Sequence, residues 1–149
     1  MIDRVFETFK RFGAKAIPFL LSSTRESDFK FQLNLARSLG KIGRPAIKPI
    51  LSRLNRSRDP NEKSLLLYSL GKIKDPAVIQ AIPALLKGLK NEDQEVRDSA
   101  ARTLGKVFEV TPPSKISFRN RNLTPHRRVE PRRIGVTREA MELYFRHLT

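Results

Sequence analysis

The sequence predicts an all-α protein: a short right-handed α-solenoid of stacked helical hairpins, followed by an extended basic C-terminal tail that ends in a short helix. Three observations predict this class. A Leu-Gly-Lys motif recurs along the chain, apolar residues around it lie three and four apart, and no segment alternates with the period of a half-buried strand. We therefore expect a solenoid over residues 1–108, an extended tail over 109–136, an amphipathic helix over 137–149, and no strands.

The recurring motif marks the repeats. It begins at Leu39, Leu70 and Leu104, and a degenerate copy begins at Phe9. Glycine accepts the left-handed backbone of a helix C-cap, so the glycine of each full copy, at positions 40, 71 and 105, is expected to end the first helix of a hairpin. A single hairpin cannot bury its apolar face alone, so neighbouring hairpins must stack.

Helix starts agree with this register. Asp59 offers an N-cap, Pro60 a first-turn proline and Glu62 the acid three residues after the cap, and the segment from Asn91 repeats this logic. The second helices follow from apolar residues at positions 47, 50, 51 and 54, and again at 79, 82, 86 and 89. Prolines 49 and 83 fall within them, so each of these helices should be kinked or should begin late.

The last hairpin should be incomplete. The helical pattern breaks after Phe108, and Thr111-Pro112-Pro113 cannot open a second helix, because a residue that precedes proline disfavours helical geometry. We expect three full hairpins and the lone first helix of a fourth.

The run from Asp93 to Val107 has acidic turn residues, then Val-Arg, Ala-Ala and Leu-Gly. It resembles the HEAT-like repeat of phycobilisome lyase-type proteins, and the resemblance covers about residues 1–108. It implies a HEAT-type solenoid in which Arg97 has a structural role in repeat-to-repeat packing. It also implies acidic phycobiliproteins as partners, either of a small antenna-binding or linker-like factor or of a bilin lyase subunit. The chain is much shorter than the lyase subunits, which favours the binding factor.

The charge is large and uneven. The chain has a net charge of +15, with thirteen basic and four acidic residues over positions 1–58, eight and seven over 59–108, and nine and four over 109–149. Such an excess bears on partners rather than on the fold. The two ends of the chain are therefore the expected contact regions.

Candidate partner-binding residues lie in both regions. Arginine forms bidentate bonds with carboxylates and phosphates, which favours the arginine-rich tail. The terminal helix is too short to be stable alone and should dock on its own solenoid or on a partner. The candidates are Arg119, Arg121, Arg127, Arg128, Arg132 and Arg133, with Tyr144 and Phe145, in the tail, and Arg37, Arg44, Lys48 and Arg53 in the solenoid. The motif lysines at 41, 72 and 106 are better explained as cations that favour a helix C-terminus.

Catalytic and metal chemistry find no support. The chain has no cysteine, which excludes disulfides, thiolate zinc sites and a cysteine nucleophile. His126 and His147 lack metal-ligand spacing, and there is no glycine-rich phosphate loop. Acid pairs such as Glu92-Asp93 are better explained by helix capping than by proton transfer. We expect no enzyme, metal, cofactor or small-molecule substrate.

Three functions remain open. The first is a scaffold or assembly factor that grips an acidic protein or multi-subunit complex. The second is nucleic-acid binding, for example to ribosomal RNA, which would be mainly phosphate-directed because residues 111–135 contain a single aromatic, Phe118. The third is a subunit of a bilin lyase. Because no segment resembles a signal peptide or a membrane span, we expect no membrane insertion and a location in the cytoplasm, or in the plastid stroma of a photosynthetic eukaryote.

Overall fold

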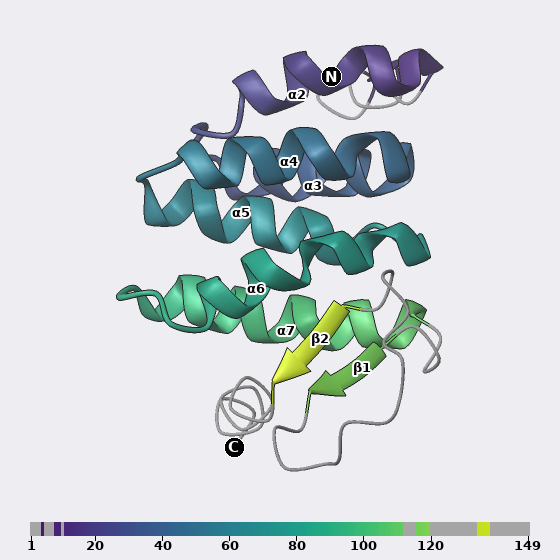
Figure 1. Ribbon diagram of the computed structural model, residues 1–149. Coiled ribbons are helices and arrows are strands. Elements are labelled where there is room, and N and C mark those ends of the chain that lie inside the picture. The colour runs from purple at the N-terminus through teal and green to yellow at the C-terminus, as the bar shows by residue number, and fades with distance from the viewer. Residues whose placement is uncertain (1–3, 5–7, 10, 112–115, 120–133, 138–149) are drawn as a thin grey trace.

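A computed structural model describes residues 4, 8–9, 11–111, 116–119 and 134–137 of the 149-residue chain. Within them the chain forms a stack of helices in sequence order (Figure 1). The helices are η1 (Gly13–Ala16), α2 (Ile17–Ser22), α3 (Phe29–Ile42), α4 (Arg44–Arg56), α5 (Pro60–Gly71), η2 (Pro76–Ala81), α6 (Ile82–Gly88) and α7 (Gln94–Val110). The prediction of an all-α solenoid is confirmed.

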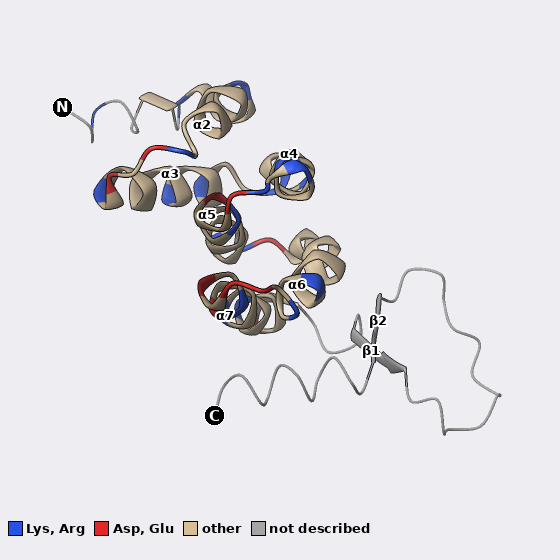
Figure 2. Cartoon of the chain, turned by 90° about the vertical axis from the view of Figure 1, so that its left-hand side faces the viewer, with Lys and Arg blue, Asp and Glu red and all other residues tan. Residues whose placement is uncertain are grey.

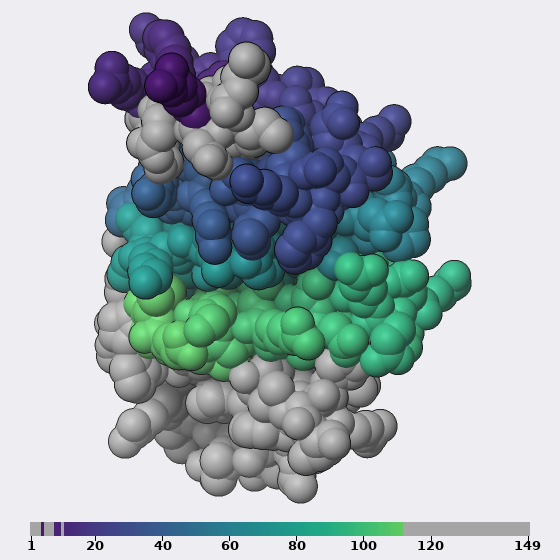
Figure 3. All heavy atoms as spheres, turned by 180° about the vertical axis from the view of Figure 1, so that it is seen from behind, coloured from purple at the N-terminus to yellow at the C-terminus, as the bar shows by residue number. Residues whose placement is uncertain are grey.

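The helices form two rows. The first helices of the hairpins, α3, α5 and α7, lie on one side, and the second helices, α2, α4 and α6, lie on the other (Figure 2). Helix α5 packs against α3 and α7 in its own row, and against α4 of the previous hairpin. Seen from behind, the colours pass from purple through blue and teal to green, so each layer lies against its neighbours in the chain (Figure 3).

An aliphatic core holds the two rows together. Leu35 and Leu39 of α3, Leu66 and Leu70 of α5 and Leu104 of α7 are completely buried. Burying each of these side chains stabilises the fold by about 1.5–3 kcal/mol. Ile47, Ile50, Ile82 and Leu85 complete the core from the second row. Stacking therefore buries what a single hairpin would leave exposed.

Aspartates cap the helices of the first row. The side chain of Asp59 accepts a hydrogen bond from the amide of Asn61 at 3.0 Å, as predicted. The start predicted at Asn91 lies two residues too early, because Asp93 caps α7 and accepts from the amides of Glu95 and Val96. The side chain of Asn91 instead accepts from the amide of Asp93, which shapes the preceding turn.

Of the three motif glycines expected to end a first helix, Gly71 does end α5, although without a positive φ angle, and the expectation is wrong at Gly40 and Gly105. Helix α3 continues through Gly40 to Ile42 and α7 continues to Val110, while positive φ angles occur in the described residues at Gly13 and Gly43. A Cβ atom at Gly40 would lie 2.5 Å from Cβ of Lys72 and 2.7 Å from its carbonyl oxygen. Glycine at this position therefore lets α3 approach the end of α5 closely.

The two prolines behave differently. Pro83 lies in the first turn of α6, which begins at Ile82 after the 3-10 helix η2, so the prediction of a late start is confirmed there. Pro49 lies inside α4, which begins earlier at Arg44 with Pro45 in its first turn. The second element of the hairpin that begins with α5 is thus divided into η2 and α6, whereas the second helix of the previous hairpin, α4, is continuous.

Two short strands follow α7. Strand β1 (Ile116–Arg119) pairs in parallel with β2 (Ile134–Thr137), with Ile116 opposite Ile134. The expectation of no strands is wrong here, because four-residue segments are too short to show an alternating pattern. Where a second helix would follow α7, the next described element is β1, as expected for a lone first helix. Apart from Thr137, the terminal helix predicted over residues 137–149 lies outside the described residues.

Candidate interaction surface

The row of second helices carries cations without acids. Helices α2, α4, η2 and α6 contain no Asp or Glu, although α4 alone contains four Lys or Arg residues. Within the described residues the acids lie on α5, on α7 and in the connecting loops, several of them as N-caps, and α3 of the first row also contains none (Figure 2). We call the exposed side of α2, α4 and α6 the second-helix face. The charged side chains that its helices contribute are all Lys or Arg, so its charge is positive.

Helix α4 contributes an exposed stripe to this face. Arg44, Lys48, Ser52 and Asn55 follow one another at intervals of four and three residues and are all exposed. Arg44 also pairs with Asp75 of the next hairpin, Nη2 to Oδ1 at 3.1 Å. At so exposed a site this pair contributes less than about 1 kcal/mol. Arg44 thus links two hairpins and still faces solvent, as Lys48 does.

Arg53 serves the interior instead. Its Nε donates to Oε1 of Glu62 at 2.7 Å, and the side chain of Glu62 has no exposed surface. Arg53 was predicted to bind a partner because it lies in a basic run. The structure pairs it with this buried carboxylate, while 30% of the Arg53 side chain stays exposed.

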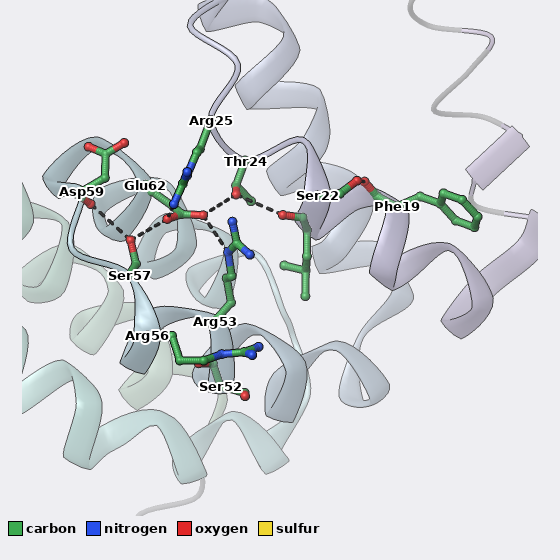
Figure 4. Close-up of polar contacts among 11 residues, drawn as sticks. Phe19, Ser22, Thr24, Arg25, Ser52, Arg53, Arg56, Ser57, Asp59 and Glu62 are labelled. Atoms are coloured by element: carbon green, nitrogen blue, oxygen red, sulfur yellow. Dashed lines mark hydrogen bonds and ion pairs between the residues drawn. The ribbon is translucent and has the colours of Figure 1, made fainter.

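Glu62 is the centre of a polar cluster that joins four parts of the chain (Figure 4). Thr24 Oγ1 donates to Oε1 and Ser57 Oγ donates to Oε2, each at 2.5 Å, while Nε of Arg25 lies 3.9 Å from Oε2. We call Thr24, Arg53, Ser57 and Glu62 the Glu62 cluster. It connects the α2–α3 loop, α4, the α4–α5 turn and α5.

The cluster keeps Glu62 ionised. Burial raises the pKa of this carboxyl, but the hydrogen bonds from Ser57, Thr24 and Arg53 and the charge of Arg53 outweigh burial and lower the pKa below its ordinary value. The sequence prediction treated Glu62 as part of a capping box. Its spacing from Leu65, Leu66 and Leu70 places it on the buried face of α5, and this was the signal that could have revealed it.

A groove lies in the second-helix face between α4 and α6. Its volume is about 520 Å³, and no carboxylate lines it in the part of the chain that the structure describes. Its apolar walls are Leu51, Leu54, Leu67, Pro83, Ala84 and Val96. The remaining lining includes Ser52, Asn55, Gln80 and Asn91 and the cations Lys63 and Lys87. We call it the α4–α6 groove; sequence reasoning missed it.

A second hollow of about 530 Å³ lies across the first helices α3, α5 and α7. Phe29 and Tyr68 are its exposed aromatic residues. Its lining has both charges, with Arg25 and Arg102 but also Asp59 and Glu95. This mixed lining favours neither a positive nor a negative ligand, whereas the lining of the α4–α6 groove favours a negative one.

The other predicted residues fall into three groups. Arg37 is exposed on α3, and Arg119 lies in β1. Arg121, Arg127, Arg128, Arg132, Arg133, Tyr144 and Phe145 lie outside the described residues, as do both histidines.

Arg97 and two of the motif lysines, for which the sequence predicted a role in the fold and not in partner binding, make contacts within the chain. Arg97 donates to the carbonyls of Asn91 and Glu92 at 2.7 and 2.8 Å, so it fixes its own α6–α7 loop rather than packing one repeat on the next. Lys72 lies over the ring of Tyr68, 4.8 Å from its centroid, and Lys106 pairs with Glu109 at 3.4 Å. These contacts give the motif lysines local partners.

The described ranges contain neither a candidate metal site nor a candidate membrane-spanning helix. No group of three His, Asp or Glu side chains there could hold a metal ion. Among these residues no helix is both long enough and apolar enough to cross a membrane.

Residues 47–118, from α4 into β1, match the family model for HEAT repeats. No curated protein and no solved structure matches the chain. The match supports HEAT-like repeats and contains nothing specific to the phycobilisome lyase type, so that finer resemblance stays a prediction.

Proposed function

We propose that this HEAT-like repeat protein is a non-catalytic scaffold or assembly factor that binds an acidic protein through its second-helix face. HEAT repeats generally mediate protein–protein interaction, and a solenoid offers an extended surface for it. The observation that carries the proposal is the absence of Asp and Glu from α2, α4, η2 and α6. A row of helices that only contacts water would not need to be free of acidic residues.

Charge complementarity explains how such a face would choose its partner. A positive face attracts an acidic surface over several ångströms and repels basic ones, so it contributes to specificity and to the association rate. Lys48 and Arg56 of α4 are exposed, and Asp75, which approaches the stripe, pairs with Arg44. Most of the positive charge therefore remains for a partner.

The class of partner is the finer part of the proposal. The resemblance of residues 93–107 to phycobilisome lyase-type repeats supports a phycobiliprotein or antenna complex, which is acidic. In this hypothesis the chain acts as a linker-like factor, and the arginines of the tail extend the contact. A bilin lyase subunit would need a partner chain that supplies the chemistry.

The proposal is tested by capture from a lysate of the source cells, at moderate salt, with and without nuclease. The full chain is compared with Lys48→Glu/Arg56→Glu on the second-helix face. The control is Lys30→Glu/Arg102→Glu on the first helices, which changes the net charge equally at exposed positions. We expect acidic proteins to survive nuclease treatment, to be lost about tenfold with the first variant and to be retained with the control.

Two results would overturn it. Loss of all captured material with nuclease would favour the nucleic-acid alternative, which the net charge of +15 supports. Equal capture by both double variants would show that total charge, and not the second-helix face, governs binding.

A further inference from the structure

The α4–α6 groove arises from the division of one second helix. Proline lacks a backbone N–H and its ring crowds the preceding turn of a helix, and Pro83 lies in the first turn of α6, where η2 ends. Helix α4 then packs on η2 and α5, whereas α6 packs on α7. The C-terminal half of α4 and the short α6 are left apart, with Leu67 of α5 and Val96 of α7 lining the space between them.

The floor of the groove is held rigidly. A Cβ atom at Gly88 would lie 2.8 Å from Cβ of Ala100 and 3.5 Å from Cδ1 of Leu67. Glycine therefore allows α6 to sit directly on α7 and α5. Leu67, Leu85 and Ala100 are buried around this contact, so the opening between α4 and α6 is not closed by inward movement of α6.

The lining has the composition of a peptide site. Leucines, Pro83 and Ala84 form apolar walls, and Ser52, Asn55 and Asn91 provide hydroxyl and amide groups that can bond a peptide backbone. Lys63 and Lys87 are its charged residues, and the α4 stripe leads to it from Lys48. No aromatic side chain lines it in the described part of the chain, so it offers nothing on which a nucleic-acid base could stack.

We propose that the α4–α6 groove binds a short segment of a partner protein in which one or two bulky aliphatic residues are flanked by Asp or Glu. The aliphatic side chains enter between Leu51, Leu54 and Ala84, and the acids pair with Lys63 and Lys87. This inference rests on the proposed function and specifies it: the acidic partner is recognised by a segment that is apolar as well as acidic. A volume of about 520 Å³ suits a few side chains rather than a folded surface.

The test uses a displayed random-peptide library selected on the full chain, with Ala84→Phe as counter-selection because the larger side chain fills the groove. We expect enriched peptides to combine neighbouring aliphatic residues with flanking acids. No enrichment above the Ala84→Phe background, or enrichment without an excess of acids, would overturn the proposal.

The most enriched peptide is then labelled and titrated by fluorescence anisotropy. We expect Lys87→Glu to weaken binding about tenfold, and Lys74→Glu, an equal charge change at an exposed position outside the groove, to change it less than about twofold. Exchange of the peptide's aliphatic residues for serine should weaken binding about tenfold or more. Circular dichroism checks each variant, and Lys87→Glu, which changes only an exposed residue, keeps the test valid should Ala84→Phe disturb the fold.

The remaining outcomes separate this inference from the proposed function. Two results would overturn the proposal for the groove: equal affinity for the aliphatic and serine peptides, or an equal loss of peptide affinity with Lys87→Glu and Lys74→Glu. Neither result would contradict the capture of acidic proteins by the second-helix face. Displacement of the peptide by polyuridylate RNA would overturn it in favour of phosphate binding. If the wild-type chain binds the peptide but captures no acidic protein, the wider proposal is overturned instead.

Discussion

The carboxylate of Glu62 accepts hydrogen bonds from Thr24, Arg53 and Ser57. One side chain therefore ties three earlier segments of the chain to α5. We predict that Glu62→Ala lowers the free energy of unfolding by about 2–4 kcal/mol, because Arg53 loses its ion pair and the buried Thr24 and Ser57 lose their short hydrogen bonds to the carboxylate. Urea denaturation followed by circular dichroism measures this. Glu95→Ala, at an exposed position in the first turn of α7, is the control and should cost less than about 1 kcal/mol.

The lowered pKa of Glu62 predicts a dependence on pH. A group whose pKa is lower in the folded state stabilises the fold above its ordinary value, here 4.5, and this stability is lost as the pH falls through the folded value. The difference in unfolding free energy between the wild type and Glu62→Gln should therefore be full near neutral pH and shrink below about pH 4.5. Urea midpoints of both proteins across this range measure it. A difference that stays constant would contradict the ionised cluster.

At the scale of the helices, Gly40 controls how closely α3 meets α5. We predict that Gly40→Ala destabilises the fold by about 1–3 kcal/mol, because the added methyl group would overlap the backbone of Lys72. Gly71→Ala is the matched control in the next motif copy, where the nearest atom, Oγ1 of Thr103, would lie 3.4 Å away. It should be neutral or stabilising by up to about 1 kcal/mol, since alanine favours the helix. Thermal melting of both variants compares them, and equal losses would contradict the close approach at Gly40.

The sequence was sufficient for the helical elements wherever a local pattern determines them. Asp59 and Pro60 mark the start of α5, and Thr111 marks the end of α7. The role of Gly40 could not be predicted, because its neighbour Lys72 belongs to the next repeat. Strands β1 and β2 are set by pairing between distant segments, which local spacing does not show.

The candidate site was predictable only in part, for the same reason. The basic stripe of α4 follows from Arg44 and Lys48 at helical spacing. The α4–α6 groove does not, because Leu51, Leu67 and Val96 come from three helices and meet only after stacking. The ion pair of Arg53 was not predicted, because its partner, Glu62, also fits a capping motif.

For the whole molecule, like charges oppose folding. Helices α3 and α4 together contain seven Lys or Arg residues and no Asp or Glu. We predict that raising NaCl from about 20 mM to about 500 mM increases the urea midpoint, because salt screens repulsion between exposed charges while the buried Arg53–Glu62 pair is screened much less. Lys48→Glu/Arg56→Glu should reduce this salt effect, and a midpoint that falls with salt would contradict it.

Within the described helices, the absence of acids from the second-helix row also separates charge, so the outward side of α2, α4 and α6 is the positive end of a local electric dipole. A dipole experiences a torque in the field of a negatively charged body before any contact is made. During diffusion toward an acidic protein the chain would be turned so that this row arrives first. Fewer collisions are then wasted on the opposite side, and the benefit appears in the speed of encounter rather than in the lifetime of the complex.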